Sequence, residues 1–326
     1  MTVNTTINNS SCKPQHMDIL IPAFLSIIFA LGFVLSALSL YTFWFRFKRW
    51  NTGMIIQFNL ALSDIIIAPT APLIVISFSL SNQWPFGQFL CQLEACLLSA
   101  HMYGSTYFLT LVSVHRYSTV VHLTKNSVFK NQKFVKSVCL AVWIFLFVKG
   151  LPFFFILRAS KVDNITQCLS IHQTEMASLF FIWSMVNLFP GLVIPFGVSV
   201  ICYCLLGCYI VKMGANLPNG KGVKVKSMGI IAVSLITFVG CCFPVQLSRS
   251  AAVIVKQFYP GKCQWLLKFE NLYYIFFVLA NVRCCLDTLL YWFSSRKFQA
   301  SFKGILQSFR CQCKMQGPVL SSDTSV

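Results

Sequence analysis

Seven long apolar segments, each with few or no charged side chains, run through this chain and constrain what it can fold into. A helix needs about 20 apolar residues to cross the hydrocarbon core of a bilayer, and each segment supplies them. Backbone polar groups must be paired inside lipid, which favours helices, and the alternation typical of a β-barrel is missing from the sequence. The predicted spans cover residues 19–45, 54–80, 91–121, 137–157, 176–211, 227–248 and 271–295, the fifth being long enough to include some loop.

The composition supports this interpretation and excludes other classes of protein. Apolar residues make up 56% of the chain, charged residues make up 10%, and the mean hydropathy is +0.71. Because a soluble domain carries about 25% charged residues, a cytosolic enzyme, a disordered chain, a coiled coil and a collagen are excluded. We therefore predict an all-α membrane protein in which residues 1–18 precede a seven-transmembrane helix bundle, 19–295, and a tail, 296–326.

The distribution of basic residues predicts which way the bundle faces. The connections at residues 46–49, 125–136 and 212–226 and the tail are rich in Lys and Arg, whereas the other side carries five acidic residues. Basic loops remain in the cytoplasm, so the amino terminus is predicted to be extracellular. The net charge of +18 is spread over several loops, and nucleic acid is therefore not an expected partner.

Two other features fall on the predicted outer side. Four acceptor motifs for N-glycosylation lie there, which is where such sites must be, at Asn4, Asn8, Asn9 and Asn164. Four cysteines share that side: Cys12, Cys91, Cys168 and Cys263. An oxidising compartment favours bridges among them, and their spacing leaves three pairings open. Cysteines inside the spans are interpreted as small apolar filler, and no metal site is predicted because no His accompanies them at ligand spacing.

The tail starts with a basic amphipathic stretch, residues 295–309, which Cys311 and Cys313 follow. We predict a short eighth helix at the membrane surface, held to the lipids by palmitoylation of both cysteines; reduced thiols are the alternative. The final residues, Thr324 to Val326, fit capture by a PDZ-type domain, although three residues also match by chance.

Short motifs occur in a fixed order along the spans. They are N-L-A-L-S-D at 59–64, W-P-F-G at 84–87 before Cys91, H-R-Y at 115–117, Trp143 and Pro152, Pro195 with Tyr203, F-x-x-C-x-x-P at 238–244 and D-T-L-L-Y at 287–291. Together they resemble the rhodopsin-like (class A) G-protein-coupled receptors over residues 12–302. T-A-P at 70–72, F-P-V-Q-x-x-R at 243–249 and C-C-L-D at 284–287 further resemble the purinoceptor-like branch, which recognises nucleotides, lipids and small organic acids.

This resemblance implies a multi-pass receptor of the plasma membrane that needs no cofactor, binds a small molecule and activates a heterotrimeric G protein. It also implies disulfides between Cys91 and Cys168 and between Cys12 and Cys263. A non-signalling or constitutively active scaffold or scavenger with the same fold is the alternative. A transporter or channel is disfavoured because the sequence lacks an internal repeat, and we find no pattern that indicates an enzyme.

The resemblance places an anion-binding residue at Arg249, one and a half helical turns beyond Pro244. A guanidinium binds a phosphate or carboxylate through two parallel hydrogen bonds; an ion pair with Glu94 or Glu270 is the alternative. Lys149 lies within the fourth span, where packing against a neighbouring helix, paired or snorkelling, is favoured over a place in the pocket. An aromatic wall of Tyr103, Tyr273, Tyr274 and Phe277 favours a singly anionic, lipid-like ligand, although aromatic residues also serve ordinary packing.

An unpaired charge inside a span is costly and therefore suggests function, and the main case is the group Asp64, Arg283 and Asp287. In the family, the carboxylate that matches Asp64 binds sodium together with a serine that matches Ser105. We predict that Arg283 replaces this sodium by pairing with both carboxylates, which would make ligand affinity insensitive to sodium. The alternative is that Arg283 pairs with Asp287 and does not reach Asp64.

Residues of the activation switch are also carried over from the resemblance. They are Arg116, Tyr203, Phe238, Pro244 and Tyr291, in addition to the three charged residues and Ser105. The chain departs from the family at His115, where an acid usually accompanies the arginine, at Cys242, and at Thr288, which replaces a proline. Because His115 removes an ionic restraint on the inactive state, we predict measurable signalling without ligand.

Overall fold

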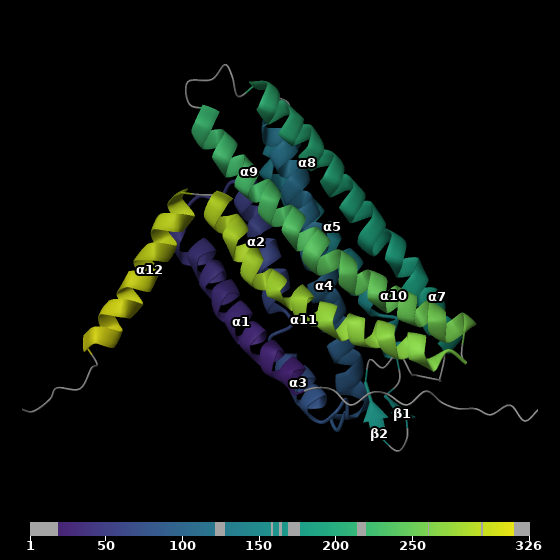
Figure 1. Ribbon diagram of the computed structural model, residues 1–326. Coiled ribbons are helices and arrows are strands. Elements are labelled where there is room, and N and C mark those ends of the chain that lie inside the picture. Colours follow the sequence, from purple (N-terminus) through teal and green to yellow (C-terminus); the bar gives the residue numbers. More distant parts are fainter. Residues whose placement is uncertain are drawn as a thin grey trace, which may run out of the picture.

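The computed structural model describes residues 19–120, 128–157, 159–162, 165–168, 177–213, 220–259, 261–294 and 296–315. All seven predicted spans are helical in it, and they lie side by side as an elongated bundle (Figure 1). The first span is α1 (Leu20–Arg46) and the third is α4 (Gly87–Val120). The fourth is α5 (Gln132–Gly150), which follows the 3₁₀ turn η1 (Val128–Lys130) and leads to the short α6 (Phe153–Ile156).

The second span is not the single helix that the sequence predicted. It consists of α2 (Thr52–Ile65) and α3 (Ala71–Ser79), separated by a turn. Pro69 lacks the N–H that would donate to the carbonyl of Ile65, and Ala68 donates to that carbonyl over 2.9 Å instead. The side chain of Asn51 caps the start of α2 by accepting a hydrogen bond of 2.8 Å from the backbone of Met54.

The fifth and sixth spans each contain a π-helical segment. The fifth is α7 (Ala177–Leu188), η2 (Phe189–Val193) and α8 (Ile194–Met213), so the loop that we expected within it is absent from its described part, 177–213. The sixth is α9 (Gly220–Ile236), η3 (Thr237–Cys242) and α10 (Phe243–Phe258), and it ends ten residues after the predicted boundary at 248. Pro195 and Pro244 follow η2 and η3 closely, and a proline interrupts the helical hydrogen bonds of the preceding turn.

The last two helices are α11 (Cys263–Ser294) and α12 (Arg296–Met315). α11 begins eight residues before the predicted boundary at 271. The charged residues Lys268 and Glu270 lie in this additional part of the helix, outside the apolar run from which the span was predicted. Phe298 of α12 is buried against Phe43 of α1 and Tyr291 of α11, at ring-centre distances of 5.4 and 5.9 Å. The seating of α12 at a membrane surface and the palmitoylation of Cys311 and Cys313 stay predictions.

Within the described residues, five helical segments are suited to cross a bilayer by length and hydropathy alone. They lie within residues 20–46, 132–156, 178–209, 228–258 and 263–293. The other two predicted spans are α2 with α3, which the turn divides, and α4, which carries buried polar residues such as Glu94 and His101. α4 contacts α2, α5 and α8 and is the central helix of the bundle.

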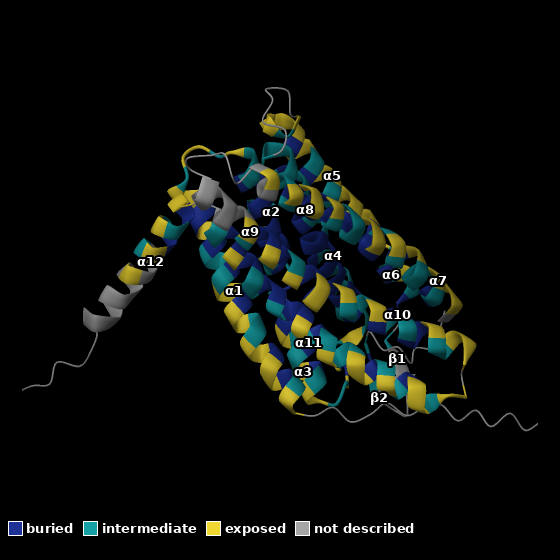
Figure 2. Cartoon of the chain, turned by 45° about the horizontal axis from the view of Figure 1, so that its top comes forward, coloured by how far each residue is buried: buried dark blue, intermediate teal, exposed yellow. Residues whose placement is uncertain are grey.

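The bundle is apolar on the outside and holds its charges inside. Large apolar side chains such as Phe147, Phe155 and Trp44 are exposed on the outer faces of the helices, where Figure 2 shows exposed positions along the rim. Arg283 and Asp287 are fully buried. This arrangement suits a hydrocarbon solvent, in which apolar side chains face lipid and ionisable ones turn to the interior.

A short hairpin covers the outer end of the bundle (Figure 1). β1 (Ser160–Val162) and β2 (Ile165–Gln167) pair antiparallel, with Lys161 opposite Thr166. The predicted Cys91–Cys168 disulfide is confirmed and ties the hairpin to the first turns of α4. Cys263 is disulfide-bonded as well.

Several predicted sites fall outside the described residues. These are Cys12, so that its pairing with Cys263 stays a prediction, the four glycosylation acceptors Asn4, Asn8, Asn9 and Asn164, and the carboxyl-terminal residues 324–326.

Candidate ligand-binding site

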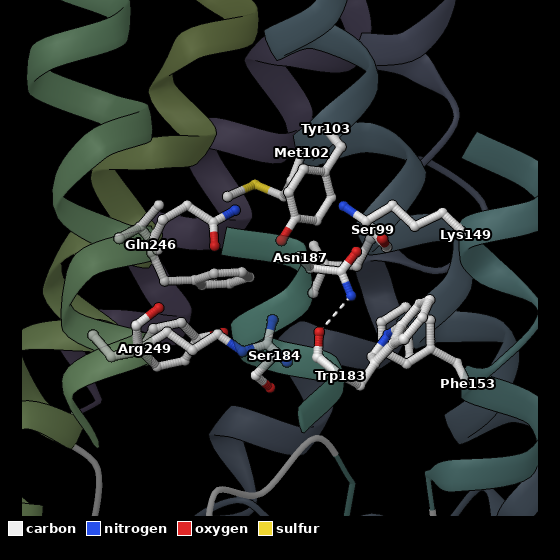
Figure 3. A pocket seen from close by; sticks show the side chains of 16 residues that line it. Ser99, Met102, Tyr103, Lys149, Phe153, Trp183, Ser184, Asn187, Gln246 and Arg249 are labelled. Carbon is white, nitrogen blue, oxygen red and sulfur yellow. Dashed lines mark hydrogen bonds between the residues drawn. The ribbon is translucent and has the colours of Figure 1, made fainter. Parts of the chain in front are cut away.

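A cavity of about 50 Å³ lies in the outer half of the bundle between α4, α5, α7, α10 and α11. We call it the outer cavity. Five of the six predicted ligand contacts line it: Tyr103, Lys149, Arg249, Tyr273 and Phe277. Figure 3 shows the side chains of Tyr103, Lys149 and Arg249 reaching toward this space from separate helices. The structure therefore brings together residues that are up to 174 positions apart in the chain, from Tyr103 to Phe277.

Lys149 points into the outer cavity from the last turn of α5 (Figure 3). Its side chain is buried, and its ammonium nitrogen lies 2.6 Å from the centre of the Tyr103 ring. Among the described residues this nitrogen has no hydrogen-bond partner. The paired or snorkelling lysine that we favoured from the sequence is thus not what the structure shows.

Arg249 is half-buried on α10, and it borders the cavity with its guanidinium carbon 5.9 Å from the centre of the Phe180 ring. The alternative was an ion pair with Glu94 or Glu270. Neither pair is formed within the part of the chain that the structure describes. Arg249 and Lys149 therefore place two basic groups at one cavity.

Tyr274 is the predicted contact that does not line the outer cavity. Its hydroxyl accepts a hydrogen bond from Asn82 and donates one to Glu270, both over 3.1 Å. The outer cavity is also lined by residues that were not predicted from the sequence, including Trp183, Asn187 and Gln246. Asn187 and Gln246 are polar residues within apolar spans, and this is the signal that could have identified them.

Below the cavity, the predicted switch residues Asp64 and Ser105 are in contact. The Ser105 hydroxyl donates a hydrogen bond of 2.6 Å to Asp64 Oδ1 and lies 3.1 Å from the hydroxyl of Ser63. The other carboxylate oxygen of Asp64, Oδ2, is buried and has no hydrogen-bond partner in the described chain. Asp64 is thus held on one side by α4 and unsatisfied on the other.

Arg283 does not bridge the two carboxylates as predicted. Its Nε lies 4.0 Å from Asp287 Oδ2, and its two terminal nitrogens each donate over 3.2 Å to the backbone carbonyls of His101 and Met102. Among the described residues, Asp64 is not a hydrogen-bond or ion-pair partner of Arg283, so the alternative, a pair with Asp287 alone, describes the contacts. The prediction of sodium-insensitive affinity therefore loses the bridge that supported it. The backbone carbonyls of α4 compete with the Asp64 carboxylate for the guanidinium. They are neutral, so pairing with them does not require a second charged group to be desolvated.

His101 is part of this cluster and was not singled out in the sequence. Its Nδ1 lies 3.0 Å from the carbonyl oxygen of Ser63, and its Nε2 lies 3.4 Å from a terminal nitrogen of Arg283. A guanidinium only donates, so Nε2 must accept and Nδ1 must carry the proton. The geometry therefore assigns a neutral imidazole between α2 and Arg283.

The remaining switch residues lie toward the cytoplasmic end. Tyr203 packs in a small cluster with Leu206 and Ile231, and Tyr291 packs against Phe43 with ring centres 5.5 Å apart. Phe238 lies in η3, and Pro244 follows in the first turn of α10. His115 lies next to Arg116 in the chain, and its Nε2 is 2.9 Å from the hydroxyl of Thr52 at the start of α2.

The chain is similar to known receptors over most of its length. The family model described as 7 transmembrane receptor (rhodopsin family) matches residues 37–291. Purinoceptor 3 of Meleagris gallopavo is 27% identical over 309 residues, which cover 93% of this chain and 94% of the relative. Cysteinyl leukotriene receptor 1 of Mus musculus is 27% identical over 303 residues, covering 91% and 85%. Purinoceptor 2 of Homo sapiens is 29% identical over 280 residues, covering 86% and 74%.

Proposed function

Because this chain belongs to the rhodopsin family of seven-transmembrane receptors, we propose that it binds an anionic small molecule in the outer cavity and activates a heterotrimeric G protein. The protein is a multi-pass receptor of the plasma membrane. The names of its relatives include receptors for purines and for a cysteinyl leukotriene. These names support a ligand that carries an acidic group, without choosing between nucleotides and lipids.

The observation that carries this proposal is the buried ammonium of Lys149. It lines the outer cavity beside Arg249 and has no hydrogen-bond partner within the described chain. Burying a cation without a counter-charge costs several kcal/mol. An anion that enters the cavity supplies the missing partner, and Arg249 adds the planar donor pair that carboxylates and phosphates accept.

The remaining lining supports a singly charged, largely apolar ligand. Four aromatic side chains line the outer cavity with the two basic groups: Phe153, Trp183, Tyr273 and Phe277. A triphosphate carries more negative charge than these two residues balance, and its polar chain gains nothing from an aromatic wall. A lipid-like acid matches both features, because its acidic group can pair with the two basic side chains and its apolar chain can pack against the aromatic rings.

Binding must also enlarge the cavity, because about 50 Å³ is far below the 300–1,000 Å³ of a typical ligand site. Met102 lines the outer cavity, and its backbone carbonyl accepts a hydrogen bond from Arg283. Arg283 also donates to Cys242 Sγ over 3.5 Å, two residues before Pro244. A ligand that displaces Met102 therefore acts on the joint between η3 and α10, and its preference for the enlarged state shifts the receptor population.

A ligand screen tests the proposal. Anionic lipids, nucleotides and carboxylic acids are applied to cells that express the receptor, and G-protein dissociation is measured. We expect a lipid-like acid to activate the wild type and to lose at least about tenfold in potency with Arg249→Ala or with Lys149→Met. Lys268→Ala is the matched control, since it removes a basic residue that is exposed and does not line the outer cavity.

Two outcomes would contradict the proposal. A ligand whose potency ignores both cavity variants would place the binding site elsewhere. A receptor that binds such acids and never dissociates any G protein would favour the alternative, a non-signalling scaffold or scavenger.

A further inference from the structure

A second buried charge of opposite sign lies beside the outer cavity. Glu94 of α4 is fully buried, and neither of its carboxylate oxygens has a hydrogen-bond partner within the described chain. The hydroxyl of Thr70 lies near this carboxylate, but it donates to the backbone carbonyl of Ile67 over 3.3 Å. Glu94 is therefore a buried carboxyl group that makes no hydrogen bond with the described chain.

Glu94 lines a cavity of about 40 Å³, which we call the side cavity. It lies between α3, α4 and α11, and the outer cavity lies on the other side of a thin wall. Leu98, Tyr273 and Phe277 line both spaces. These shared side chains belong both to the cavity that Glu94 lines and to the cavity that Lys149 and Arg249 line.

The charges on the two sides of this wall do not neutralise each other. Glu94 and Lys149 are both buried and both unpartnered in the described chain, and no ion pair joins Glu94 to Lys149 or Arg249 there. A structural ion pair would bring its members into contact, because desolvation is repaid only at short range. Keeping them apart leaves an acceptor at one end of the site and donors at the other.

The size of the side cavity limits the group that fits beside Glu94. A cavity needs a volume of about 10–15 Å³ to hold one water molecule, so about 40 Å³ accepts a small group such as a primary ammonium. Such a group brings three donors and a positive charge, which is what the two carboxylate oxygens lack. A quaternary ammonium has no N–H to donate.

The spacing along α4 sets the length of the ligand. The Lys149 nitrogen lies over the ring of Tyr103, which follows Glu94 by nine positions on α4. At 1.5 Å per residue, the backbone positions of Glu94 and Tyr103 are about 13 Å apart along the helix axis. An extended chain advances about 1.2 Å per bond, so about a dozen atoms span this distance. An α-amino acid, with its two charges on neighbouring atoms, is too short to reach both ends.

We propose that the receptor recognises an elongated zwitterion, with an acidic group on Lys149 and Arg249, an apolar chain between Tyr273 and Phe277, and a primary amine on Glu94. This inference rests on the proposed function, because it adds a second anchor to the same anion site. Binding opens the wall between the two cavities and gives Lys149, Arg249 and Glu94 a partner of opposite charge at the same time.

Matched probes of equal chain length test the second anchor. Purified full-length receptor is titrated with ω-aminododecanoic acid and with dodecanoic acid, and binding is followed as a shift of the thermal unfolding midpoint. We expect the amino acid to bind the wild type at least about tenfold more tightly, the value of one charge-assisted hydrogen bond. Glu94→Gln abolishes this preference, so that the two probes bind the variant with equal affinity.

Glu270→Gln is the matched control. Glu270 is buried at the outer end like Glu94, but it already accepts a hydrogen bond from Tyr274, and it lines neither cavity. The tenfold preference must survive in this variant. A preference that is equally lost with Glu270→Gln, or that persists in Glu94→Gln, overturns the assignment of the amine to Glu94.

A labelling experiment on the wild type covers the case in which Glu94→Gln does not fold. An apolar carbodiimide modifies buried carboxyl groups, and peptide mass spectrometry reports the modified fraction at Glu94. We expect ω-aminododecanoic acid to reduce this fraction at least about fivefold more than dodecanoic acid does, by the same ammonium contact. Equal protection by both probes, or no binding of the amino acid, overturns the inference.

The inference and the proposed function fail separately. If dodecanoic acid binds and depends on Arg249 while the amine adds nothing, the zwitterion is excluded and the anion site stands. If both probes bind without regard to Arg249 and Lys149, the anion site itself is excluded.

Discussion

The ammonium nitrogen of Lys149 lies 2.6 Å from the centre of the Tyr103 ring, so that a cation from α5 rests on an aromatic face of α4 inside the outer cavity. A cation over a tyrosine ring gains about 0.5–2 kcal/mol. Removing the ammonium from water costs more than that. The contact is therefore a partial compensation, and Lys149 is retained at a net cost to stability.

Replacing Lys149 should make the receptor more stable and less responsive. Lys149→Met removes the unpartnered ammonium and fills the same space with an apolar chain, which we expect to raise the free energy of unfolding by about 1–3 kcal/mol. Thermal unfolding in detergent measures this change, with Lys268→Met as a surface control. A lower unfolding midpoint in Lys149→Met would show that the lysine serves packing.

The ring of Tyr103 also depends on a glycine of the fifth span. Gly191 in η2 is buried, and a Cβ atom added there would overlap the edge of the Tyr103 ring. We expect Gly191→Ala to lower the free energy of unfolding by about 1–3 kcal/mol, because the ring has to move. Gly197→Ala is the control on the same span, since a Cβ at that position meets no atom within 4 Å. In a Tyr103→Ala background, Gly191→Ala should lower the free energy of unfolding much less than it does in the wild type. An equal loss in both backgrounds would contradict the contact.

Replacing Arg283 alone should lower the free energy of unfolding more than replacing both Arg283 and Asp287, because the single variant leaves a buried carboxylate without its partner. Neither oxygen of Asp287 has a hydrogen-bond partner in the described chain, so the guanidinium 4.0 Å away is its main compensation. We expect Arg283→Met to destabilise the receptor by about 3–5 kcal/mol. The double variant Arg283→Met/Asp287→Asn should lose less than the single variant, as judged by thermal unfolding. An equal or larger loss in the double variant would mean that Arg283 acts mainly through the α4 carbonyls.

An acid at position 115 should reduce signalling in the absence of ligand. His115 turns to the hydroxyl of Thr52, 2.9 Å away, and offers no counter-charge to Arg116. His115→Asp supplies that charge and should lower basal G-protein dissociation by about fivefold or more, equivalent to about 1 kcal/mol in favour of the inactive state. Thr52→Val removes the hydrogen bond without adding charge and serves as the control. Wild-type basal activity equal to that of empty vector, for every G-protein class, would refute this explanation.

Much of the fold could be predicted because hydropathy is a sum over neighbouring positions. A run of about 20 apolar residues identifies a span whatever it packs against, and all seven predicted spans are helical. The predicted bounds are wrong where one local feature, such as a proline or a charged residue, changes the helix or the hydropathy of the segment. Pro69 divides the second span, and charged residues near the outer ends of the sixth and seventh spans made them appear shorter than α10 and α11 are.

The site divides in the same way. Sequence motifs identified Arg249 and Asp64, and the family resemblance implied Ser105 and the Cys91–Cys168 disulfide, a pairing that cysteine spacing alone had left open. Spacing in one helix could not show that Arg283 turns to the carbonyls of His101 and Met102 in place of Asp64. It also could not show that Tyr274 leaves the cavity wall, or that Glu94 faces Lys149 across three shared side chains.

Residue order and hydropathy were sufficient to predict seven membrane spans and an extracellular amino terminus. Which buried charges come into contact depends on the tertiary structure. Successive residues of a helix point about 100° apart, so partner choice depends on how each helix is rotated and tilted against its neighbours. That rotation is set by the packing of all seven spans together, and no single segment carries it.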